Sequence, residues 1–539
     1  MKNSVFHQRA RFFLVTLLLA GTTHVAAGQN TEDAFRYSYR DPAVGPRMIG
    51  LAGASHAGVA DWSALVSNPA GLGYFERSAV SLGLKYADVS NDVTSVSEGV
   101  TPDNSGGTVT SNNASHTDLS YVYRVPTIQG SFVLAVGYSQ VASFTRDLRY
   151  SGQNYRSTIT TSFLPFAGEY SLDDQNNLSE LDNLPFAAFN GGFIEFYPEF
   201  LDDNPEAYPF LEAVVPGSRI DQHLRVMESG GLSEVSFGGA MEISRGVMLG
   251  LSLNIPFGEY HFRSEFEEID TYNENNADDY SVAQDDGSFL EGFDRLSYRQ
   301  RLRSDIVGIN ARLGVSAELL KQIRIGFTIE TPTAYSVEES YGAEYMTQFD
   351  DGGLLRYGER SDDVGSGSFA YEILSPTRLS VGIRYTWGPV TAFADLERVG
   401  WNEVRFSAKS DQVFFDALNQ NIDVEWSADR LNKRLGIELQ FGRFDIRAGA
   451  ASYPHPHAYL SSSEGSPLQI NRDRDYGSFG LGYRMNKHLQ FDLAWFQTSY
   501  ESGYVAYPED DLGQRQKYTV QIDEAVTDRR FIVGATYLF

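Results

Sequence analysis

The chain contains no cysteine. This absence excludes disulfides and thiolate metal sites, and it excludes a lipoprotein anchor, which requires a cysteine directly after the signal sequence. Basic residues are also scarce, because 43 Lys and Arg stand against 71 Asp and Glu and leave a net charge of −28. A chain this acidic repels a polyanion, so nucleic acid is excluded as a partner.

Long apolar segments are missing everywhere except at the start. Residues 1–28 predict a secretory signal peptide, with basic residues first, an apolar stretch over 12–20 and the small residues Val25-Ala26-Ala27 before cleavage. The apolar stretch is shorter than the roughly 20 residues that cross a bilayer. No later segment is long and apolar enough for a transmembrane helix, so a membrane protein with this sequence must be a β-barrel.

Alternation of apolar and polar residues repeats along the chain. In residues 247–258, Leu249, Leu251 and Leu253 share one face with other apolar residues, and Gly250, Ser252 and Asn254 share the other. Such period-two alternation predicts a strand with one apolar face. Fourteen segments follow this pattern, near 78–89, 118–125, 131–144, 232–244, 247–263, 303–318, 322–337, 371–387, 390–405, 424–441, 443–453, 474–485, 488–500 and 528–539.

The connections between these segments alternate in length. Those after the even-numbered strands are short, as at 126–130, 245–246, 388–389 and 486–487, whereas those after the odd-numbered strands are long and polar. Short turns at one rim and long loops at the other are typical of outer-membrane barrels. We therefore predict an all-β fold, a 14-stranded antiparallel transmembrane β-barrel with long extracellular loops. The even count predicts that both termini are periplasmic.

The last segment ends the chain on an aromatic residue. Phe531, Val533, Ala535, Tyr537 and Phe539 alternate on its apolar face. A terminal aromatic residue suits the girdle at the membrane interface. We predict that Gly534, Tyr537 and Phe539 form the signal that the barrel-assembly machinery recognises.

Residues 29–77 separate the signal peptide from the first strand. This segment is rich in Gly and Ala, too apolar for a solvated tail, and too short for a sizeable core of its own. A fourteen-stranded barrel has a lumen too wide for its own side chains to fill. We predict that residues 29–77 fold as a plug, or hatch, inside the lumen of a barrel formed by residues 78–539.

The plug segment carries a family resemblance. Residues 54–72, with their small side chains, Asp61 and the motif Asn68-Pro69-Ala70, resemble the N-terminal hatch of the FadL/TodX family of outer-membrane transporters. Residues 395–401, with acidic residues before a Trp, resemble a late strand of that family, and residues 375–385 resemble one of its strand beginnings. Fourteen is also the family's strand number. The resemblance implies passive uptake of long-chain fatty acids or aromatic hydrocarbons through a loop groove, a pocket beside the hatch and a gap in the wall.

The loop over residues 145–231 is the longest connection. Its aromatic residues include Phe186, Phe189, Phe193 and Phe196, whose spacing of three and four predicts one face of a helix. An extracellular loop with this much apolar surface must pack on something. We consider a hydrophobic ligand groove and a private core that caps the barrel to be equally plausible. The candidate groove comprises Phe186, Phe189, Phe193, Phe196, Tyr197, Phe200 and Leu211.

Charged residues on the polar strand faces are mixed in sign and predict a wet, ion-paired lumen around the plug. They are Arg124, Glu242, Arg312, Arg324, Glu330, Arg384, Asp395, Arg434, Glu438, Arg447 and Asp492. We find no catalytic constellation and predict no enzymatic activity, no cofactor and no metal site.

The leading hypothesis is an outer-membrane channel for hydrophobic compounds, with a hydrophobic small molecule, outer-membrane lipid, lipopolysaccharide and the barrel-assembly machinery as partners. One alternative is a porin for polar solutes, which predicts an empty lumen. Another is a scaffold barrel of a type IX-like secretion system, whose large loop would bind protein. A third is an outer-membrane lipase, which requires a Ser–His pair that the sequence does not place.

Overall fold

The structure is a computed structural model. It describes residues 31–96, 100–102, 109–204, 207–276, 280–284, 286–358, 364–408, 415–426, 430–456, 472–507 and 520–539. The predicted signal peptide, residues 1–28, lies outside the described residues.

The strands form a closed antiparallel β-barrel of fourteen strands. Closure is made by the first and last strands, which pair from Ala79↔Leu538 to Val96↔Ile522. The predicted fold class is therefore confirmed. At the end with short turns the wall consists of β1 (Ala79–Val96), β3 (Val109–Val125), β4 (Phe132–Ser143), β10 (Ile220–Ser244), β11 (Val247–Ile269), β14 (Arg295–Leu320), β15 (Ile323–Glu330), β19 (Arg378–Trp387), β20 (Val390–Val399), β22 (Leu431–Phe441), β23 (Phe444–Tyr453), β24 (Arg474–Arg484), β25 (Leu489–Val505) and β26 (Gln521–Leu538).

Four further strands continue the wall toward the long loops. They are β5 (Arg146–Asn154), β16 (Ala334–Gln348), β18 (Gly367–Leu374) and β21 (Arg405–Ala408), which extend β4, β15, β19 and β20 in that order. Short strands β2 (Val100–Pro102) and β17 (Leu354–Tyr357) pair with β5 and β16. Three small hairpin sheets lie in the loops: β6 (Tyr170–Leu172) with β7 (Leu178–Leu181), β8 (Ile194–Phe196) with β9 (Phe210–Glu212), and β12 (Ser281–Ala283) with β13 (Phe289–Glu291).

Helices are short and lie in the N-terminal segment or in the connections. The N-terminal segment contains α1 (Thr31–Ser38), α2 (Pro46–Ile49) and the 3-10 helices η2 (Trp62–Leu65) and η3 (Pro69–Tyr74). The others are η4 (Ile159–Phe163), α3 (Asn183–Asn190), α4 (Glu199–Asp203), η5 (Trp401–Glu403) and α5 (Asp416–Glu425). Within the described ranges, no helix has the length and apolarity needed to cross a bilayer.

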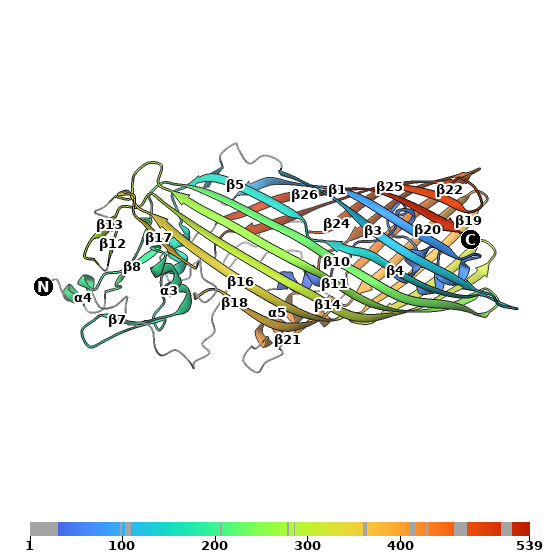
Figure 1. The fold of residues 1–539 in the computed structure, drawn as a ribbon, viewed down its shortest axis with the longest axis horizontal. Coiled ribbons are helices and arrows are strands. Elements are labelled where there is room, and N and C mark those ends of the chain that lie inside the picture. The colour runs from blue at the N-terminus through green and yellow to red at the C-terminus, as the bar shows by residue number, and fades with distance from the viewer. Residues whose placement is uncertain are drawn as a thin grey trace.

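Short turns gather at one end of the barrel, as predicted. Ser244 pairs with Val247, Trp387 with Val390, and Phe441 with Phe444, so only a few residues turn the chain. The C-terminus lies at this end, and the long connections lie at the other (Figure 1). We call these the turn end and the loop end.

An apolar belt surrounds the outside of the barrel near the turn end. Outward-facing Leu82, Leu253, Val381, Leu435 and Val533 are all exposed, although they are apolar. The inward-facing residues between them are polar or small, as the alternation dictates. At the turn end the belt finishes in an aromatic rim that includes Trp387, Phe444, Tyr537 and Phe539. Tyr537 and Phe539 of the predicted assembly signal therefore face outward, whereas Gly534 lies on the lumen side, close to Pro46.

Several strands extend far beyond the belt toward the loop end. On β11 the apolar belt ends at Phe257, and the next outward residue, Glu259, is charged and 51% exposed at its side chain. β10 begins at Ile220 and β14 at Arg295, well before the predicted starts at 232 and 303. The large loop is correspondingly shorter than the predicted 145–231 and runs between β5 and β10, over residues 155–219.

Candidate functional site

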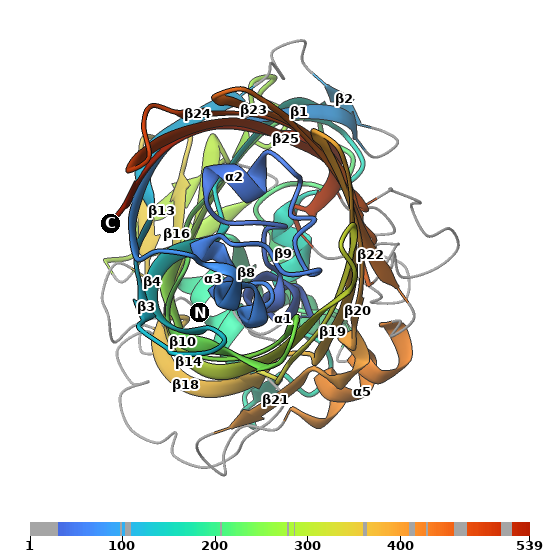
Figure 2. The same ribbon diagram turned by 90° about the vertical axis from the view of Figure 1, so that its right-hand side faces the viewer.

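The described part of the N-terminal segment, residues 31–77, lies inside the barrel, as the view along its axis shows (Figure 2). Two side chains organise the local fold. The Asp61 carboxylate accepts a hydrogen bond from the Ser63 amide at 3.0 Å and caps η2. The Asn68 side chain accepts one from the Ala70 amide at 3.1 Å and caps η3, with Pro69 at the first helical position. Both are N-cap arrangements that satisfy amides at a helix start. We call this segment the plug.

Asn68 also joins the plug to the wall. Its side-chain amide donates to the carbonyl oxygens of His56 at 2.6 Å and Val315 on β14 at 3.2 Å. Asn68 is completely buried. The motif Asn68-Pro69-Ala70 therefore has a structural place, and it does not line the cavity described below.

Wall glycines let the plug approach the barrel closely. A Cβ atom on Gly326 would overlap the His56 carbonyl oxygen, and one on Gly314 would overlap the Asn68 side chain. A Cβ atom on Gly382 would lie 2.5 Å from the Ala57 amide nitrogen. Only glycine leaves room for backbone at this distance. Sequence reasoning missed this contact, because a glycine in a strand does not reveal what approaches it.

Buried ion pairs hold the plug from several sides. Arg40 Nη1 lies 2.7 Å from Glu234, which also binds Arg312 at 2.7 Å. Arg47 lies 3.2 Å from Glu438, which also accepts from Arg447 at 2.6 Å. Each carboxylate therefore binds one arginine from the wall and one from the plug, so these ion pairs join the plug to the wall. The predicted ion-paired lumen is present among the described residues.

Asp395 on β20 anchors a third point of the plug. One carboxylate oxygen accepts from the Ser55 amide at 2.7 Å and the His56 amide at 2.9 Å, and lies 3.0 Å from His56 Nδ1. The neighbouring Ser55 hydroxyl donates to the Gly53 carbonyl oxygen at 3.4 Å instead of to His56. Ser55, His56 and Asp395 therefore form an anchor and do not have the geometry of a hydrolytic triad.

Three adjacent wall strands are interrupted at one height. β15 and β16 are separated by residues 331–333, β18 and β19 by residues 375–377, and β20 and β21 by residues 400–404. Pro332, Pro376 and Gly400 lie in these interruptions, and a proline cannot donate a ladder hydrogen bond. On the loop side of the interruption β21 pairs with β18, and no other strand among the described residues covers its second edge. We call this region the wall break.

Helix α5 covers the open edge of β21. The Asn419 side chain accepts from the Phe406 amide at 2.8 Å and donates to the Phe406 carbonyl oxygen at 2.9 Å, as a neighbouring strand would. Arg405 and Asp423 add an exposed ion pair at 2.6 Å. Helix α5 and β21 lie together at one side of the barrel (Figure 2). At this point a helix therefore completes the wall.

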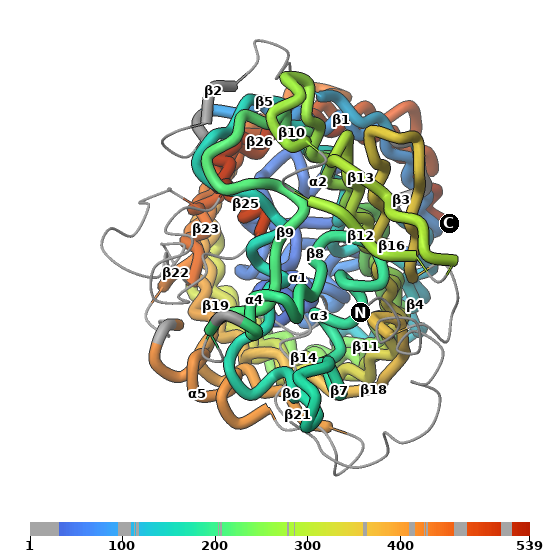
Figure 3. The backbone as a smooth tube through the Cα atoms, turned by 90° about the vertical axis from the view of Figure 1, so that its left-hand side faces the viewer, coloured from blue at the N-terminus to red at the C-terminus, as the bar shows by residue number. Residues whose placement is uncertain are grey.

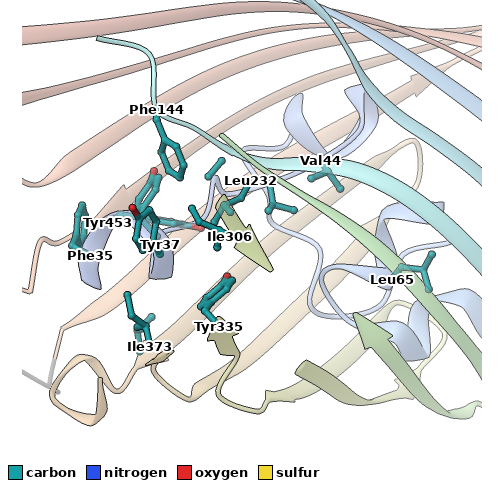
Figure 4. Close-up of a cluster of buried hydrophobic side chains, with 14 of the residues drawn as sticks. Phe35, Tyr37, Val44, Leu65, Phe144, Leu232, Ile306, Tyr335, Ile373 and Tyr453 are labelled. Carbon is teal, nitrogen blue, oxygen red and sulfur yellow. The ribbon is translucent and has the colours of Figure 1, made fainter. Parts of the chain in front are cut away.

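An apolar cluster runs from the plug into the wall break. Phe35 of α1 lies 5.3 Å from Trp401, measured between ring centroids, and Trp401 lies 5.9 Å from Trp426 beyond α5. Phe415 and Ile422 belong to the same buried cluster, which also contains Tyr37 and Tyr453. Figure 4 shows Phe35, Tyr37 and Tyr453 close together in the lumen, with Ile373 of β18 nearby. An apolar path, filled with side chains, therefore connects the lumen to the wall break.

A small polar cavity adjoins this cluster between plug and wall. Its volume is about 60 Å³, enough for two water molecules. Its walls are formed by plug residues such as Arg40 and His56 and by a second group from β15, β19, β20, β22 and β23, namely Thr328, Glu330, Arg378, Ser380, Glu397, Arg434 and Tyr453. Tyr453 belongs both to this lining and to the apolar cluster.

Two buried donors at the cavity have no partner. Among the described residues, neither Arg434 Nη1 nor the Thr328 hydroxyl makes a hydrogen bond. The other Arg434 nitrogens bind the Tyr453 hydroxyl at 2.6 Å and Glu397 at 2.8 Å. A buried donor without an acceptor is costly, so each group would gain from an acceptor atom brought within its reach. Arg434 was predicted to face the lumen, whereas Thr328 carried no signal in the sequence.

A cap closes the loop end (Figure 3). We define the cap as residues 155–219, which run between β5 and β10, together with the residues of other long connections that pack on them. The predicted helical face is only partly present, because α3 ends at Asn190 and Gly191 and Gly192 break it. Phe193 is fully buried, with its ring centroid 5.5 Å from that of Phe163, and Phe196 is buried in β8. Of the remaining candidate groove residues, Phe186, Phe189, Tyr197 and Leu211 are partly buried, and Phe200 is exposed.

A buried carboxyl group ties the cap to the barrel. Glu268 of β11 accepts hydrogen bonds from the Ile159 amide at 3.0 Å, the Thr158 hydroxyl at 2.5 Å and Gln222 at 2.7 Å. It lies beyond the belt and is completely buried. Burial raises the pKa of Glu268 to about 7, although these hydrogen bonds favour the charged form and the nearby Glu212 opposes it.

Comparison with known proteins gives a likeness in fold. The sequence matches no protein-family model and no curated protein sequence. The structure is similar to that of a Pseudomonas aeruginosa FadL homologue, with a TM-score of 0.52, 13% identity and coverage of 93% of this chain and 99% of that chain. The P. putida toluene transporter TodX gives a TM-score of 0.49 at 13% identity over 93% of this chain and 99% of that chain. The Ralstonia pickettii toluene transporter TbuX gives 0.44 at 14% identity over the same shares. Of these three structures, only the FadL homologue gives a TM-score above 0.5, and its likeness supports the predicted β-barrel fold.

Among the described residues, no group of three or more His, Asp or Glu side chains could hold a metal ion.

Proposed function

We propose that this chain is an outer-membrane channel for passive uptake of hydrophobic molecules, and that its preferred ligand is an amphiphile with an acidic head group. This proposal rests on one observation: the polar cavity lies beside an apolar cluster that continues into the wall break. An acidic head group would accept from Thr328 and Arg434, and an apolar tail would replace the side chains around Phe35 and Trp401. The FadL-like fold is consistent with this assignment.

The apolar belt supports a membrane location. Outward-facing apolar residues belong in lipid, because water exposure of so many would be unfavourable. The extended strands and the cap then lie outside the cell, and the turn end faces the periplasm. In this setting lipid and lipopolysaccharide surround the barrel, and the barrel-assembly machinery would recognise Gly534, Tyr537 and Phe539.

Uptake requires movement, because a cavity of about 60 Å³ is far smaller than a long-chain acid. The ligand would leave the cap, displace part of the plug or its aromatic cluster, and exit sideways at the wall break. The break lies at the loop-end edge of the belt, where outward Leu396 is exposed and apolar and Arg398, two residues on, is exposed and charged. The exit would therefore open into the outer leaflet. No energy source is needed, since transfer from water to an apolar path is favourable.

The binding of two hydrophobic ligands to the purified, detergent-extracted protein tests this proposal. Palmitate should bind more tightly than hexadecane, which has the same tail length and no acidic group. Equal binding would remove the acidic head group from the proposal, and no binding of either would remove hydrophobic uptake. A stoichiometric protein partner in the purified sample would favour the secretion-scaffold alternative instead.

Conductance in planar bilayers tests the porin alternative. The plug fills the lumen with buried ion pairs, so the wild-type barrel should conduct small ions poorly. A large conductance that does not change on deletion of residues 31–77 would favour a polar-solute porin.

A further inference from the structure

The outer face of the barrel beyond the belt has an unusual composition on four neighbouring strands. β5, β10, β11 and β14 are in register there, so Arg149, Arg225, Glu265 and Arg299 form one row across the strands. Closer to the belt, Arg263 pairs with Arg301 and His261 pairs with Arg303. We call this surface the outer platform. It comprises Arg149, Arg225, Arg263, Arg299, Arg301 and Arg303, the carboxylates Asp147, Glu259, Glu265, Glu267 and Asp305, and Ser151, His223 and His261.

Charge on the outer platform differs from that of the whole chain. Six arginines face five carboxylates there, whereas the chain as a whole carries a net charge of −28. An anionic ligand that the rest of the molecule would repel can therefore approach this surface. The carboxylates reduce the positive potential but supply acceptors for hydroxyl groups.

Several guanidinium groups nearest the belt remain open to a ligand. Among the described residues Arg263 has no ion-pair or hydrogen-bond partner. The side chains of Arg301 and Arg303 are 56% and 52% exposed, and their contacts to Glu344 at 3.0 Å and Asp305 at 3.1 Å lie at the surface. Such exposed ion pairs contribute little, so they are readily exchanged for a phosphate.

A hollow of about 420 Å³ lies above these arginines on the same face. Arg149, Ser151, His223, Arg225, Glu265 and Glu267 line it, together with Tyr150 and Leu224. Within the described part of the chain Glu267 has no partner, and His223 uses one ring nitrogen toward Ser151 at 2.9 Å. The size suits a small ligand, and the many donors and acceptors on its rim suit sugar hydroxyl groups.

The positions of these residues along β11 show how far the arginines and the hollow lie from the belt. On β11 the belt ends at Phe257, Arg263 follows six residues later and Glu267 ten residues later. At ~3.4 Å per residue and a tilt of about 40°, Arg263 lies about 15 Å and the hollow on the order of 25 Å beyond the belt edge. Arginines just outside the lipid, with a polar hollow further out, match a glycolipid that carries phosphates on its inner core sugars and further sugars beyond them.

We infer that the outer platform binds the phosphorylated sugar head group of an outer-leaflet glycolipid of the lipopolysaccharide type. Arg263, Arg301 and Arg303 hold the phosphates through charge-assisted hydrogen bonds. The hollow around His223 and Glu267 holds the sugars. This inference rests on the proposed outer-membrane location but not on the proposed uptake of hydrophobic ligands.

Binding of rough lipopolysaccharide with a complete phosphorylated core to the purified full chain in detergent tests the inference. The variant Arg263→Ala/Arg301→Ala/Arg303→Ala should bind at least about tenfold more weakly than the wild type, since three charge-assisted hydrogen bonds are lost. Arg529→Ala is the matched control, because Arg529 is an exposed outward arginine just above the belt on β26, with a 45% exposed side chain. It should bind like the wild type. Heat-modifiable gel migration checks that each barrel is folded.

Two results would overturn the inference: wild-type affinity in the triple variant, or an equal loss in Arg529→Ala. Phosphatidylglycerol micelles test the sugar contribution, and Glu267→Gln should weaken lipopolysaccharide binding while leaving phosphatidylglycerol binding unchanged. An equal effect on both lipids would contradict a sugar site. Palmitate binding is measured on the same samples. If palmitate binds and lipopolysaccharide does not, only the inference fails, and the reverse result removes only the proposed uptake.

Discussion

At the residue scale, the cavity between plug and wall depends on unpaired donors. Thr328→Val removes the free hydroxyl at nearly constant volume and breaks no hydrogen bond within the described structure. We expect its affinity for palmitate to fall about five- to tenfold, the value of one lost hydrogen bond, while its thermal stability is unchanged or higher. Isothermal titration of the purified protein measures the affinity.

Thr498→Val is the matched control for this experiment. The Thr498 hydroxyl is also buried without a partner, but it lies on β25 and does not line the cavity. Its palmitate affinity should equal that of the wild type. If both variants bind alike, the cavity is not the head-group site.

Glu268 makes the attachment of the cap depend on pH. Its pKa is about 7 when the cap is docked and about 4.5 when the group is in water. Docking is strongest below pH 4.5, weakens as pH rises to about 7 because the undocked carboxyl ionises first, and changes no further above that. The protection of residues 155–219 against hydrogen exchange, corrected for the intrinsic base-catalysed rate at each pH, should therefore be lower at pH 8 than at pH 5.

Glu268→Gln should remove this difference in protection between pH 5 and pH 8, because an amide does not ionise. Its oxygen can accept from Ile159 and Gln222, and its NH₂ group can donate to the Thr158 hydroxyl. Glu265→Gln on the same strand, with its side chain facing outward, should retain the wild-type difference. A pH response that persists in Glu268→Gln would assign it to another group.

Residue positions could be predicted better than residue contacts. Alternation alone placed Arg312, Asp395 and Arg434 on the lumen side, and each is buried there. Their partners could not be predicted, because Asp395 meets His56 across 339 positions of sequence. Thr328 had no distinguishing pattern, and Trp401 stood out only as the end of the resemblance in residues 395–401. Their roles arise only where plug, β15 and η5 meet.

At the element scale, the predicted ends of several strands were wrong. The errors occur where a strand is interrupted or where the alternation of apolar and polar residues is lost. Residues 322–337, 371–387 and 390–405 alternate on both sides of each interruption, so they were predicted as continuous strands. Pro332 and Pro376 were the available signals against continuity. Beyond the belt the outer face of β11 and β14 becomes charged, and the contrast between the two faces on which the prediction depends is lost.

We expect helix α5 to undock from β21 and so open the wall break for the ligand. Asn419→Ala removes both hydrogen bonds to the edge of β21 and should weaken the docking of α5 by about 1–3 kcal/mol. Hydrogen exchange of residues 416–425 should become faster, and palmitate uptake by cells should become faster as well. Asn421→Ala, an exposed position on the same helix, is the control and should change neither rate. Slower uptake in Asn419→Ala would contradict an exit at the wall break.

Seating of the plug depends on the wall glycines. Gly326→Ala places a methyl group into the His56 carbonyl oxygen and should destabilise the plug by about 1–3 kcal/mol, the usual cost of overpacking. Limited proteolysis should then cut within residues 40–67 while the barrel remains intact. Gly477→Ala has open space around its added methyl group and should behave like the wild type. Equal protease resistance of the two variants would show that this contact does not hold the plug.

At the scale of the whole molecule, a lumen of fourteen strands must be filled by something other than its own side chains. Here the plug fills it, held by buried ion pairs, glycine contacts and one aromatic cluster. The width of the lumen could be predicted from the number of strands, and the plug could be predicted from the Gly- and Ala-rich segment before the first strand. The wall break and the outer platform could not, since each is made by strands whose register only the closed barrel defines.

The central claim is that ligand passes when the plug moves relative to the wall. The chain has no cysteine, so a designed disulfide can lock the two together without competing thiols. Leu51 and Gly436 are suited to this, because a Cβ atom on Gly436 would lie 3.2 Å from the Leu51 Cβ, close to disulfide geometry after a small shift. Palmitate uptake is measured in cells that express Leu51→Cys/Gly436→Cys, with each single variant as control.

We predict that the oxidised double variant stops taking up palmitate, that a reductant restores uptake, and that the single variants respond to neither treatment. Uptake at the wild-type rate through the oxidised, fully cross-linked protein would contradict the account.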